Sequence, residues 1–280
     1  MDTASKTGLA DISVVKIGGR ALERNLGGLL DSIAREAGVR RVIVVHGGGD
    51  QVTRVSKALG IEPRFVVSPQ GIRSRYTSRE ELEVFIMVMS AINRNIVSEL
   101  ARRGVEALGV AGCDGPLFEG SRKKQIVIVD ERGRKRVIEG GYTGRIERCH
   151  RERIQRLLEL YRVLVISPLV LDPSEGVLLN TDGDEAAASI ASCVRAYEAI
   201  FVTDVPGVIV DGKVMPRISA KDKEILEKIG AGMNRKVLAA LKYIQETGGN
   251  AYICDGTSGD IFEKARTGGC TEITTENPAL

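Results

Sequence analysis

The chain has 280 residues, of which 43% are hydrophobic and 28% are charged, and its formal net charge is +3. This length suffices for one large domain or two medium-sized domains with a sizeable core. The small net charge excludes a general nucleic-acid binder. No apolar run reaches the length of a membrane span, and the first residues, MDTASKTGLAD, lack the apolar core of a signal peptide. We therefore expect a soluble cytoplasmic protein that binds neither nucleic acid nor membrane.

The cysteines and histidines give no sign of a metal site. The five cysteines are scattered and include no C-x-x-C pair: Cys113, Cys149, Cys193, Cys254 and Cys270. This spacing predicts neither a zinc site nor a disulfide framework. The two histidines, His46 and His150, are too few for a His-rich metal site.

The first predicted element is a strand within residues 11–22, DISVVKIGGRAL, and it contains a lysine. Val14, Val15 and Ile17 indicate a buried strand, which Lys16 interrupts. Burying an ammonium group without a partner is costly, so we expect Lys16 at the carboxyl end of the strand, facing a negative group. The glycines that follow would let that group approach the backbone. The alternative is a strand-end lysine exposed to solvent.

Apolar residues at helical or strand spacing continue through the first half of the chain. They predict helices at 21–37, 50–59 and 78–102, and a strand at 41–46 that runs into three more glycines. Ser78 with Glu81 three residues later is a capping-box pattern that opens the longest helix. Residues 125–141, QIVIVDERGRKRVIEGG, alternate around Gly133 and predict a hairpin. Between Phe118 and His150, nine basic residues stand against five acidic ones.

The second half repeats the alternation of strands and helices. Strands are predicted at 161–170, 198–203 and 250–255, and helices at 181–194, 221–229 and 233–246. Asp182 and Asp184 lie in the first turn of the helix at 181–194, as the helix dipole favours. Alternating strands and helices predict an α/β fold with a mostly parallel sheet and helices on both faces.

Three glycine-containing turns follow predicted strands, at 16–19, 46–49 and 203–207. Ligands bind parallel sheets at the carboxyl ends of strands, where such turns present backbone N–H groups to an anion. None of the turns reads G-x-x-x-x-G-K-[ST], which excludes a P-loop, and HGGGDQV does not fit the dinucleotide fingerprint G-x-G-x-x-G.

Five motifs in one order resemble those of the amino-acid kinase superfamily, acetylglutamate-kinase type. They are VVKIGG, VIVVHGGG, LLNTDGDEAA, FVTDVPGV and GAGMNRK, within a resemblance that runs from about Ile12 to Asp255. The resemblance implies an open three-layer αβα sandwich that forms acyl phosphates from ATP. It also implies an acceptor-binding lobe at residues 1–175 and an ATP-binding lobe at 176–280.

The resemblance assigns roles to individual residues. Lys16 and Lys236 would stabilise the transferring phosphoryl group, and Asp184 would orient both lysines, since positioned cations stabilise the charge that spreads over that group. Substrate contacts fall on Gly47, Gly48, Gly49, Arg73 and Asn180. Nucleotide contacts fall on Gly18, Gly19, Thr203, Asp204, Val205, Gly207 and Val208. Mg²⁺ would be held mostly by the nucleotide, so no metal site on the protein is expected.

One departure from that family concerns the acceptor. Acetylglutamate kinases read G-x-R-V-T where this chain has GIRSRYT at 71–77. Together with the basic hairpin at 121–142, this variant resembles the kinases that act on a LysW-type amino-group carrier protein. The resemblance implies that 2-aminoadipate or glutamate, joined to an acidic carrier, is phosphorylated on its side-chain carboxylate for lysine or arginine synthesis.

Basic residues near the acceptor pocket would then steer and hold the acidic carrier. The predicted docking residues are Arg75, Arg122, Lys123, Lys124, Arg134, Lys135 and Arg136. The alternative is a solvated hairpin with no partner. A second departure is Asp182, where acetylglutamate kinases usually have Asn. By resemblance, the long helix at 78–102 would form the interface of a homodimer.

The expected mechanism is direct in-line transfer of the γ-phosphoryl group. The acceptor carboxylate is already ionised at neutral pH and needs no general base. Three alternatives stay open: N-acetylglutamate kinase acting on the free small molecule, a related kinase acting on carbamate or a nucleotide, and a non-catalytic nucleotide-binding regulator.

Overall fold

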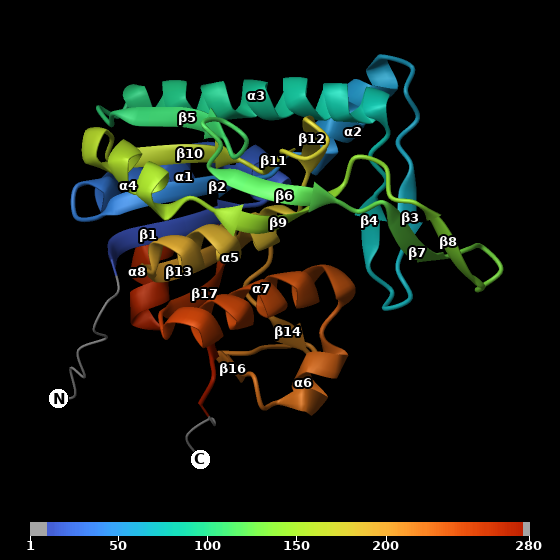
Figure 1. The fold of residues 1–280 in the computed structure, drawn as a ribbon. Helices are drawn as coiled ribbons and strands as arrows, with labels where there is room; N and C mark the ends of the chain where they lie inside the picture. Colours follow the sequence, from blue (N-terminus) through green and yellow to red (C-terminus); the bar gives the residue numbers. More distant parts are fainter. Residues whose placement is uncertain (1–9, 277–280) are drawn as a thin grey trace.

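A mixed sheet of eight strands forms the centre of the computed structural model, which describes residues 10–276 apart from the side chain of Ala231 (Figure 1). The strand order is β16 (Arg217–Ser219), β18 (Thr271–Thr274), β17 (Asn250–Asp255), β13 (Ala196–Thr203), β1 (Ala10–Ile17), β2 (Arg41–His46), β10 (Val163–Ser167) and β5 (Ala107–Ala111). Neighbouring strands are parallel except β17 and β18. The predicted α/β class is confirmed. The expectation about a signal peptide falls largely on residues 1–9, outside the described residues.

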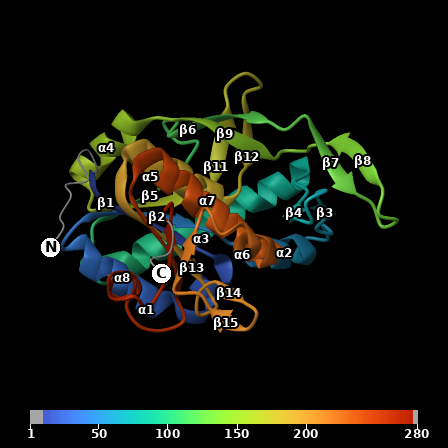
Figure 2. The ribbon, with the colours of Figure 1, turned by 90° about the horizontal axis from the view of Figure 1, so that it is seen from below.

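Helices cover both faces of this sheet and make three layers. On one face lie α1 (Gly19–Ala37), α3 (Arg79–Ala101) and α8 (Ile261–Thr267). On the other lie α4 (Arg151–Leu160), α5 (Gly183–Val194) and α7 (Ala231–Thr247). Each face has its own buried apolar cluster, because successive strand residues point to opposite faces. Figure 2 shows α5 and α7 side by side, and α2 (Gly49–Ala58) packs on α3. The short α6 (Lys223–Lys228) precedes α7.

Smaller sheets flank the carboxyl ends of the central strands. A four-stranded sheet has the order β12 (Val177–Asn180), β11 (Leu169–Asp172), β6 (Phe118–Arg122) and β9 (Gly144–Cys149). Three hairpins are β3 (Phe65–Val67) with β4 (Arg73–Arg75), β7 (Gln125–Val129) with β8 (Lys135–Glu139), and β14 (Ile209–Val210) with β15 (Lys213–Val214). Figure 1 shows β3–β4 and β7–β8 projecting beside each other, and β3 contacts β7. The predicted hairpin around Gly133, whose φ is +73°, is confirmed.

The predicted lobe boundary and one of the predicted strands both fall in the segment from β10 to β12. The single strand predicted at 161–170 is two strands, β10 and β11, because Pro168 between them has no N–H group to continue a ladder. The boundary predicted at residue 175 lies in the turn between β11 and β12, which pair with each other. In the central sheet, β1 and β13 join four strands from the first part of the chain to four from the second.

The longest helix, α3, is both long and apolar. Among residues 10–276, α3 alone has the length and hydropathy of a membrane span, so the expectation that no apolar run reaches that length was wrong. Its buried side chains, such as Met89 and Ile96, pack against α2, β5 and β10, as in the core helix of a globular fold. The predicted cap is present: the hydroxyl of Ser78 accepts a hydrogen bond from the N–H of Glu81 at 3.2 Å.

The absence of a disulfide framework was also a wrong expectation. Cys149 pairs with Cys193, and Cys254 pairs with Cys270. The partners are 44 and 16 residues apart, so no short spacing signals them. Pairing of β17 with β18 brings the second pair together. Cys113 keeps a free thiol, and burial raises its pKa to about 11.

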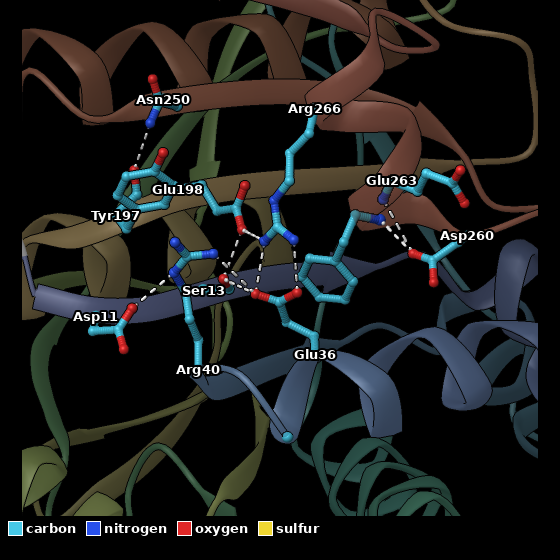
Figure 3. Close-up of polar contacts among 12 residues, drawn as sticks. Asp11, Ser13, Glu36, Arg40, Tyr197, Glu198, Asn250, Asp260, Glu263 and Arg266 are labelled. Carbon is cyan, nitrogen blue, oxygen red and sulfur yellow. Dashed lines mark hydrogen bonds and ion pairs between the residues drawn. The ribbon is translucent and has the colours of Figure 1, made fainter. Parts of the chain in front are cut away.

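A buried charge cluster ties α1 and α8 to the amino ends of β1 and β13 (Figure 3). Arg266 donates to Glu36 at 2.7 and 3.0 Å and to Glu198 at 2.7 Å. The hydroxyl of Ser13 donates to Glu198 at 2.7 Å, and Arg40 lies 3.4 Å from Glu36. We call these five residues the Glu36–Glu198 cluster. Its two buried carboxylates meet two guanidinium groups, of which that of Arg40 also pairs with the exposed Asp11 at 2.7 Å.

Candidate active site

The strand geometry explains how Lys16 is accommodated near the carboxyl end of β1. Lys16 shares a strand face with Ile12 and Val14, whose side chains pack toward α5 and α7. Only 8% of Lys16 is exposed, and its Nζ lies 3.0 Å from Oδ1 of Asp184. The negative partner expected from the sequence is therefore a carboxylate in the first turn of α5.

Asp184 also holds a second lysine. Nζ of Lys236, on α7, lies 2.9 Å from Oδ1 and 3.2 Å from Oδ2 of the same carboxylate. The three residues, which we call the Lys16–Lys236 cluster, come from β1, α5 and α7. With two ammonium groups and one carboxylate, the cluster has a surplus positive charge that favours binding of an anion.

The protonation states follow from burial and these charges. Burial would raise the pKa of Asp184, but the ammonium groups of Lys16 and Lys236 lower it to about 2. Burial, together with the positive charge of Lys16, lowers the pKa of Lys236 to about 8 against the attraction of Asp184. Burial opposes the charge of Lys16 as well, but the carboxylates of Asp184 and Asp182 raise its pKa overall. Lys236 is therefore the member whose charge is sensitive to conditions near neutrality.

Two glycine turns meet beside this cluster. The N–H of Gly47 donates to the carbonyl of Ile17 at 2.8 Å, and a Cβ added to Gly19 would lie 3.2 Å from Cα of Gly48. Gly18 and Gly48 are the N-caps of α1 and α2, and neither provides a side-chain cap. A Cβ on Gly18 would lie 3.9 Å from Nζ of Lys16. Two helix amino ends, with free N–H groups, thus lie beside an ammonium group, an arrangement suited to phosphate or carboxylate.

A cavity of 570 Å³ opens from Lys16 toward the β3–β4 hairpin. All predicted substrate-binding residues line it: Gly47, Gly48, Gly49, Arg73 and Asn180. The amide of Asn180 donates to the hydroxyl of Thr77 at 3.0 Å. Thr181 also lines the cavity, and its buried hydroxyl has no hydrogen-bond partner in the protein. Sequence reasoning missed Thr181, which offers a free polar group to a ligand.

Arg75, one of the predicted docking residues, lines this cavity. Its side chain is 9% exposed, pairs with Glu81 at 2.9 Å and donates to the carbonyl of Gly49 at 3.0 Å. Arg73 is exposed and stacks 3.7 Å from the ring centre of Phe65. The order arginine–x–threonine in Arg75-Tyr76-Thr77 was a signal in the sequence, because it keeps the last part of the family's G-x-R-V-T pattern.

The predicted nucleotide segment 203–208 lies at the same sheet edge, on the other side of β1. Thr203 ends β13, the neighbour of β1, whereas the cavity adjoins β2. None of the segment 203–208 lines the cavity, and neither do Asp184 and Lys236. Asp204 lies 3.4 Å from Arg20 and 3.5 Å from Arg24. The side chain of Val208 is buried in the core, so only its backbone is open to a role in binding.

The predicted docking residues of the β7–β8 region differ in the contacts and exposure of their side chains. Arg122 is held by Glu139 at 2.6 Å and by the carbonyl of Gly141 at 2.6 Å. Arg134 and Arg136 share Asp130, and Lys124 lies 3.6 Å from Glu175. Lys123 and Lys135 are exposed, and Lys123 also lines the cavity at the base of the hairpin.

His46 is buried at the end of β2 and is neutral. Burial lowers its pKa to about 4, its Nδ1 lies 3.3 Å from the carbonyl of Gly47, and its Nε2 lies 3.3 Å from the amide of Asn93. Within residues 10–276, no group of three or more His, Cys, Asp or Glu side chains could hold a metal ion. The arrangement can place anions between the lysines and backbone N–H groups.

Comparison with known proteins agrees with this chemistry. Residues 11–255 match the model of the amino acid kinase family. A LysW-aminoadipate/LysW-glutamate kinase of Sulfolobus acidocaldarius is 48% identical over 261 residues, 93% of this chain and 99% of the relative. The protein of that name from Sulfurisphaera tokodaii is 49% identical, covering 90% of this chain and 96% of the relative. The structure of smu.665 from Streptococcus mutans UA159 shares the fold, with a TM-score of 0.76 at 22% identity over 95% of this chain and 99% of the other. The chain therefore belongs to the amino acid kinase family.

Proposed function

We propose that this chain transfers the γ-phosphoryl group of ATP to the side-chain carboxylate of 2-aminoadipate, glutamate or both, carried on a LysW-type amino-group carrier protein. The observation that carries the proposal is the Lys16–Lys236 cluster beside a cavity lined by Arg73, Arg75 and Asn180. The names of the relatives from Sulfolobus acidocaldarius and Sulfurisphaera tokodaii support the acceptor. The product would be an acyl phosphate for lysine or arginine synthesis in the cytoplasm, and the enzyme would be a homodimer that uses α3.

The lysines would overcome the repulsion between two anions. Lys16 lines the acceptor cavity, whereas Lys236 does not line it and contacts the same carboxylate, that of Asp184. The acceptor carboxylate attacks the γ-phosphorus, a new P–O bond forms, and the bond to ADP breaks in line with it. Lys16 and Lys236 stabilise the equatorial oxygens, and Asp184 keeps both amines in place. The acceptor is ionised at neutral pH, so the neutral, buried His46 has no proton to remove.

The remaining residues would position the two substrates. Gly18 and Gly19 would donate backbone N–H groups to phosphate, and the segment 203–208 would border the nucleotide as part of an ATP lobe at 176–280. Mg²⁺ would enter with ATP, since it binds few protein carboxylates when phosphates are available. Gly47, Gly48 and Gly49, with Arg73, Arg75, Asn180 and Thr181, would hold the acceptor in the lobe at 1–175.

The carrier would dock where the cavity opens between two hairpins. Lys123 lies both in the cavity wall and at the base of β7–β8, so a chain entering the cavity passes this hairpin. The freest cations there are Lys123 and Lys135, followed by Lys124, Arg134 and Arg136. Arg122 is held by Glu139 and Gly141, so it would mainly support the hairpin.

The experiment is a phosphorylation assay with purified carrier bearing either 2-aminoadipate or glutamate, with free N-acetylglutamate as the competing acceptor. Acyl phosphate is trapped with hydroxylamine and counted by mass spectrometry. We expect product on at least one loaded carrier and a rate that falls steeply with salt, because the docking surface is charged. Product from N-acetylglutamate alone, or ATP binding without any transfer, would overturn the proposal.

A further inference from the structure

One arginine next to Lys236 joins three separate segments of the molecule. Nη1 of Arg235, on α7, lies 3.0 Å from Oδ2 of Asp182, the N-cap of α5. Nη2 of Arg235 donates to the carbonyl of Arg73, on β4, at 2.8 Å. All three residues line the acceptor cavity. The guanidinium therefore connects a hairpin of the cavity wall to the two helices that hold Asp184 and Lys236.

The carboxylate of Asp182 makes this connection possible. Its Oδ1 accepts hydrogen bonds from the backbone N–H of Asp184 at 2.8 Å and of Glu185 at 3.2 Å, which leaves Oδ2 for Arg235. An asparagine could cap α5 with its carbonyl oxygen, but its NH₂ group would then face the guanidinium, a donor against a donor. The departure from the acetylglutamate-kinase pattern at this position thus has a physical counterpart in Arg235.

We propose that Arg235 is a positioning residue, which couples the β3–β4 hairpin to Lys236 through Asp182; the proposal rests on the function proposed above. Arg235 and Lys236 are consecutive on α7, and their partners Asp182 and Asp184 lie at the start of α5. Two ion pairs therefore fix the same ends of the same two helices. When the acceptor holds the hairpin closed, the carbonyl of Arg73 holds Arg235, and α7 keeps the amine of Lys236 at Asp184.

The chain contains a matched control for this arrangement. Asp260 is the N-cap of α8, where its side chain accepts from the N–H groups of Phe262 and Glu263. Nε of Arg35, on α1, donates to the other oxygen of Asp260 at 2.8 Å. Figure 3 shows Asp260 and Glu263 on α8, beside the Glu36–Glu198 cluster. The same chemistry, an N-cap aspartate paired with an arginine of another helix, thus occurs away from the acceptor cavity.

The first measurement is steady-state kinetics of Asp182→Asn, Arg235→Met and the double variant, with Asp260→Asn and Arg35→Met as controls. Asp182→Asn keeps the cap and removes the pair with Arg235, together with one of the two carboxylates that raise the pKa of Lys16. We expect each site variant to lower kcat by about tenfold and to raise KM for the loaded carrier, with KM for ATP changed less than about twofold. The double variant should be no worse than Arg235→Met, because the two groups act as a unit. The control variants should match the wild type.

The second measurement is amide hydrogen exchange, which needs no acceptor and no turnover. We expect Arg235→Met to speed exchange in both 65–75 and 231–247, whereas Arg35→Met leaves both unchanged. Arg235→Lys should keep the pair with Asp182 but loosen 65–75, because one ammonium group cannot replace the fork that reaches both partners.

The outcomes separate the two proposals. Unchanged exchange in both segments, or changed exchange with wild-type kcat and KM, would overturn the role of Arg235 as a positioning residue. If the wild type phosphorylates no acceptor, the proposed function fails. In that case the joint exchange of the two segments alone decides whether Arg235 couples them.

Discussion

Strand β1 carries a buried charge cluster at each end, and the two clusters differ in their balance. Ser13 faces α1 and α8 and belongs to the Glu36–Glu198 cluster, in which two carboxylates meet two guanidinium groups. Lys16 faces α5 and α7, where two ammonium groups share the single carboxylate of Asp184. In the first cluster each buried carboxylate has a guanidinium partner without a ligand, whereas in the second the ammonium groups outnumber the carboxylate.

This difference distinguishes buried charges that stabilise the fold from buried charges that take part in catalysis. Buried charges are tolerated when they are paired and hydrogen-bonded, as in the Glu36–Glu198 cluster. A surplus charge in a water-poor site is unfavourable until an opposite charge arrives, and strongly shifted pKa values of this kind gather at functional sites. Changes in the Lys16–Lys236 cluster should therefore affect turnover, and changes in the Glu36–Glu198 cluster should affect stability.

The largest effect should come from Lys16→Ala. Removing one of two cations beside the transferring phosphoryl group should lower kcat by about a thousandfold, with a much smaller loss of ATP affinity. The hydroxylamine-trapping assay measures kcat, and calorimetry measures the affinity for ATP. The free energy of unfolding should change little, because Asp184 keeps Lys236 as its partner. Equal losses of turnover and ATP affinity would contradict the assignment of Lys16.

The opposite cluster should respond to Arg266→Met through stability. This change leaves Glu36 and Glu198 buried beside each other with one cation, Arg40, and should lower the free energy of unfolding by about 3 kcal/mol. Denaturant unfolding measures it, with Arg217→Met in the exposed pair with Glu272 as control, where about 0.5 kcal/mol is expected. A large loss of kcat in the folded variant would erase the distinction between the clusters.

The positive charge of Lys236 should also make kcat/KM for ATP depend on pH. Burial and Lys16 lower the pKa of Lys236 to about 8, so its ammonium group loses the proton as pH rises through that value. Above it, kcat/KM for ATP should fall by roughly tenfold for each pH unit. In Lys236→Arg the guanidinium stays charged, so this alkaline fall should vanish even if the maximum is lower. The same alkaline fall in the arginine variant would assign it to another group.

The smallest effect should come from Glu198→Gln. Arg266 keeps both contacts with Glu36, and the amide oxygen of the new side chain can still accept from Ser13. The free energy of unfolding should fall by about 1 kcal/mol, the value typical of one weakened hydrogen bond. Thermal unfolding with parallel kcat measurements tests this. A loss as large as that of Arg266→Met would show that Glu198, rather than Arg266, holds the cluster together.

Much of the architecture could be predicted because its signals are local. Apolar spacing marked β1, β2, β13 and β17 together with the long helices, and Ser78 with Glu81 marked the start of α3. Sequence patterns did not predict the short strands β3 to β6, β9, β12, β14 to β16 and β18, because segments of a few residues have no readable period and form only against neighbouring strands. The cost of burying an unpaired ammonium group anticipated that Lys16 would meet a negative group at the carboxyl end of β1.

The sequence by itself determined the α/β class, the glycine turns after β1 and β2, and the set Lys16, Asp184 and Lys236 as candidates. Only the tertiary structure decided that Arg75 lies in the cavity wall, that Arg235 joins Asp182 to Arg73, and that Arg266 neutralises Glu36 and Glu198. The reason is physical. Periodicity and motifs record how a residue relates to its near neighbours in the chain. Pairing between charges, or between cysteines, depends on which distant segments the packed core brings within about 3–4 Å of each other.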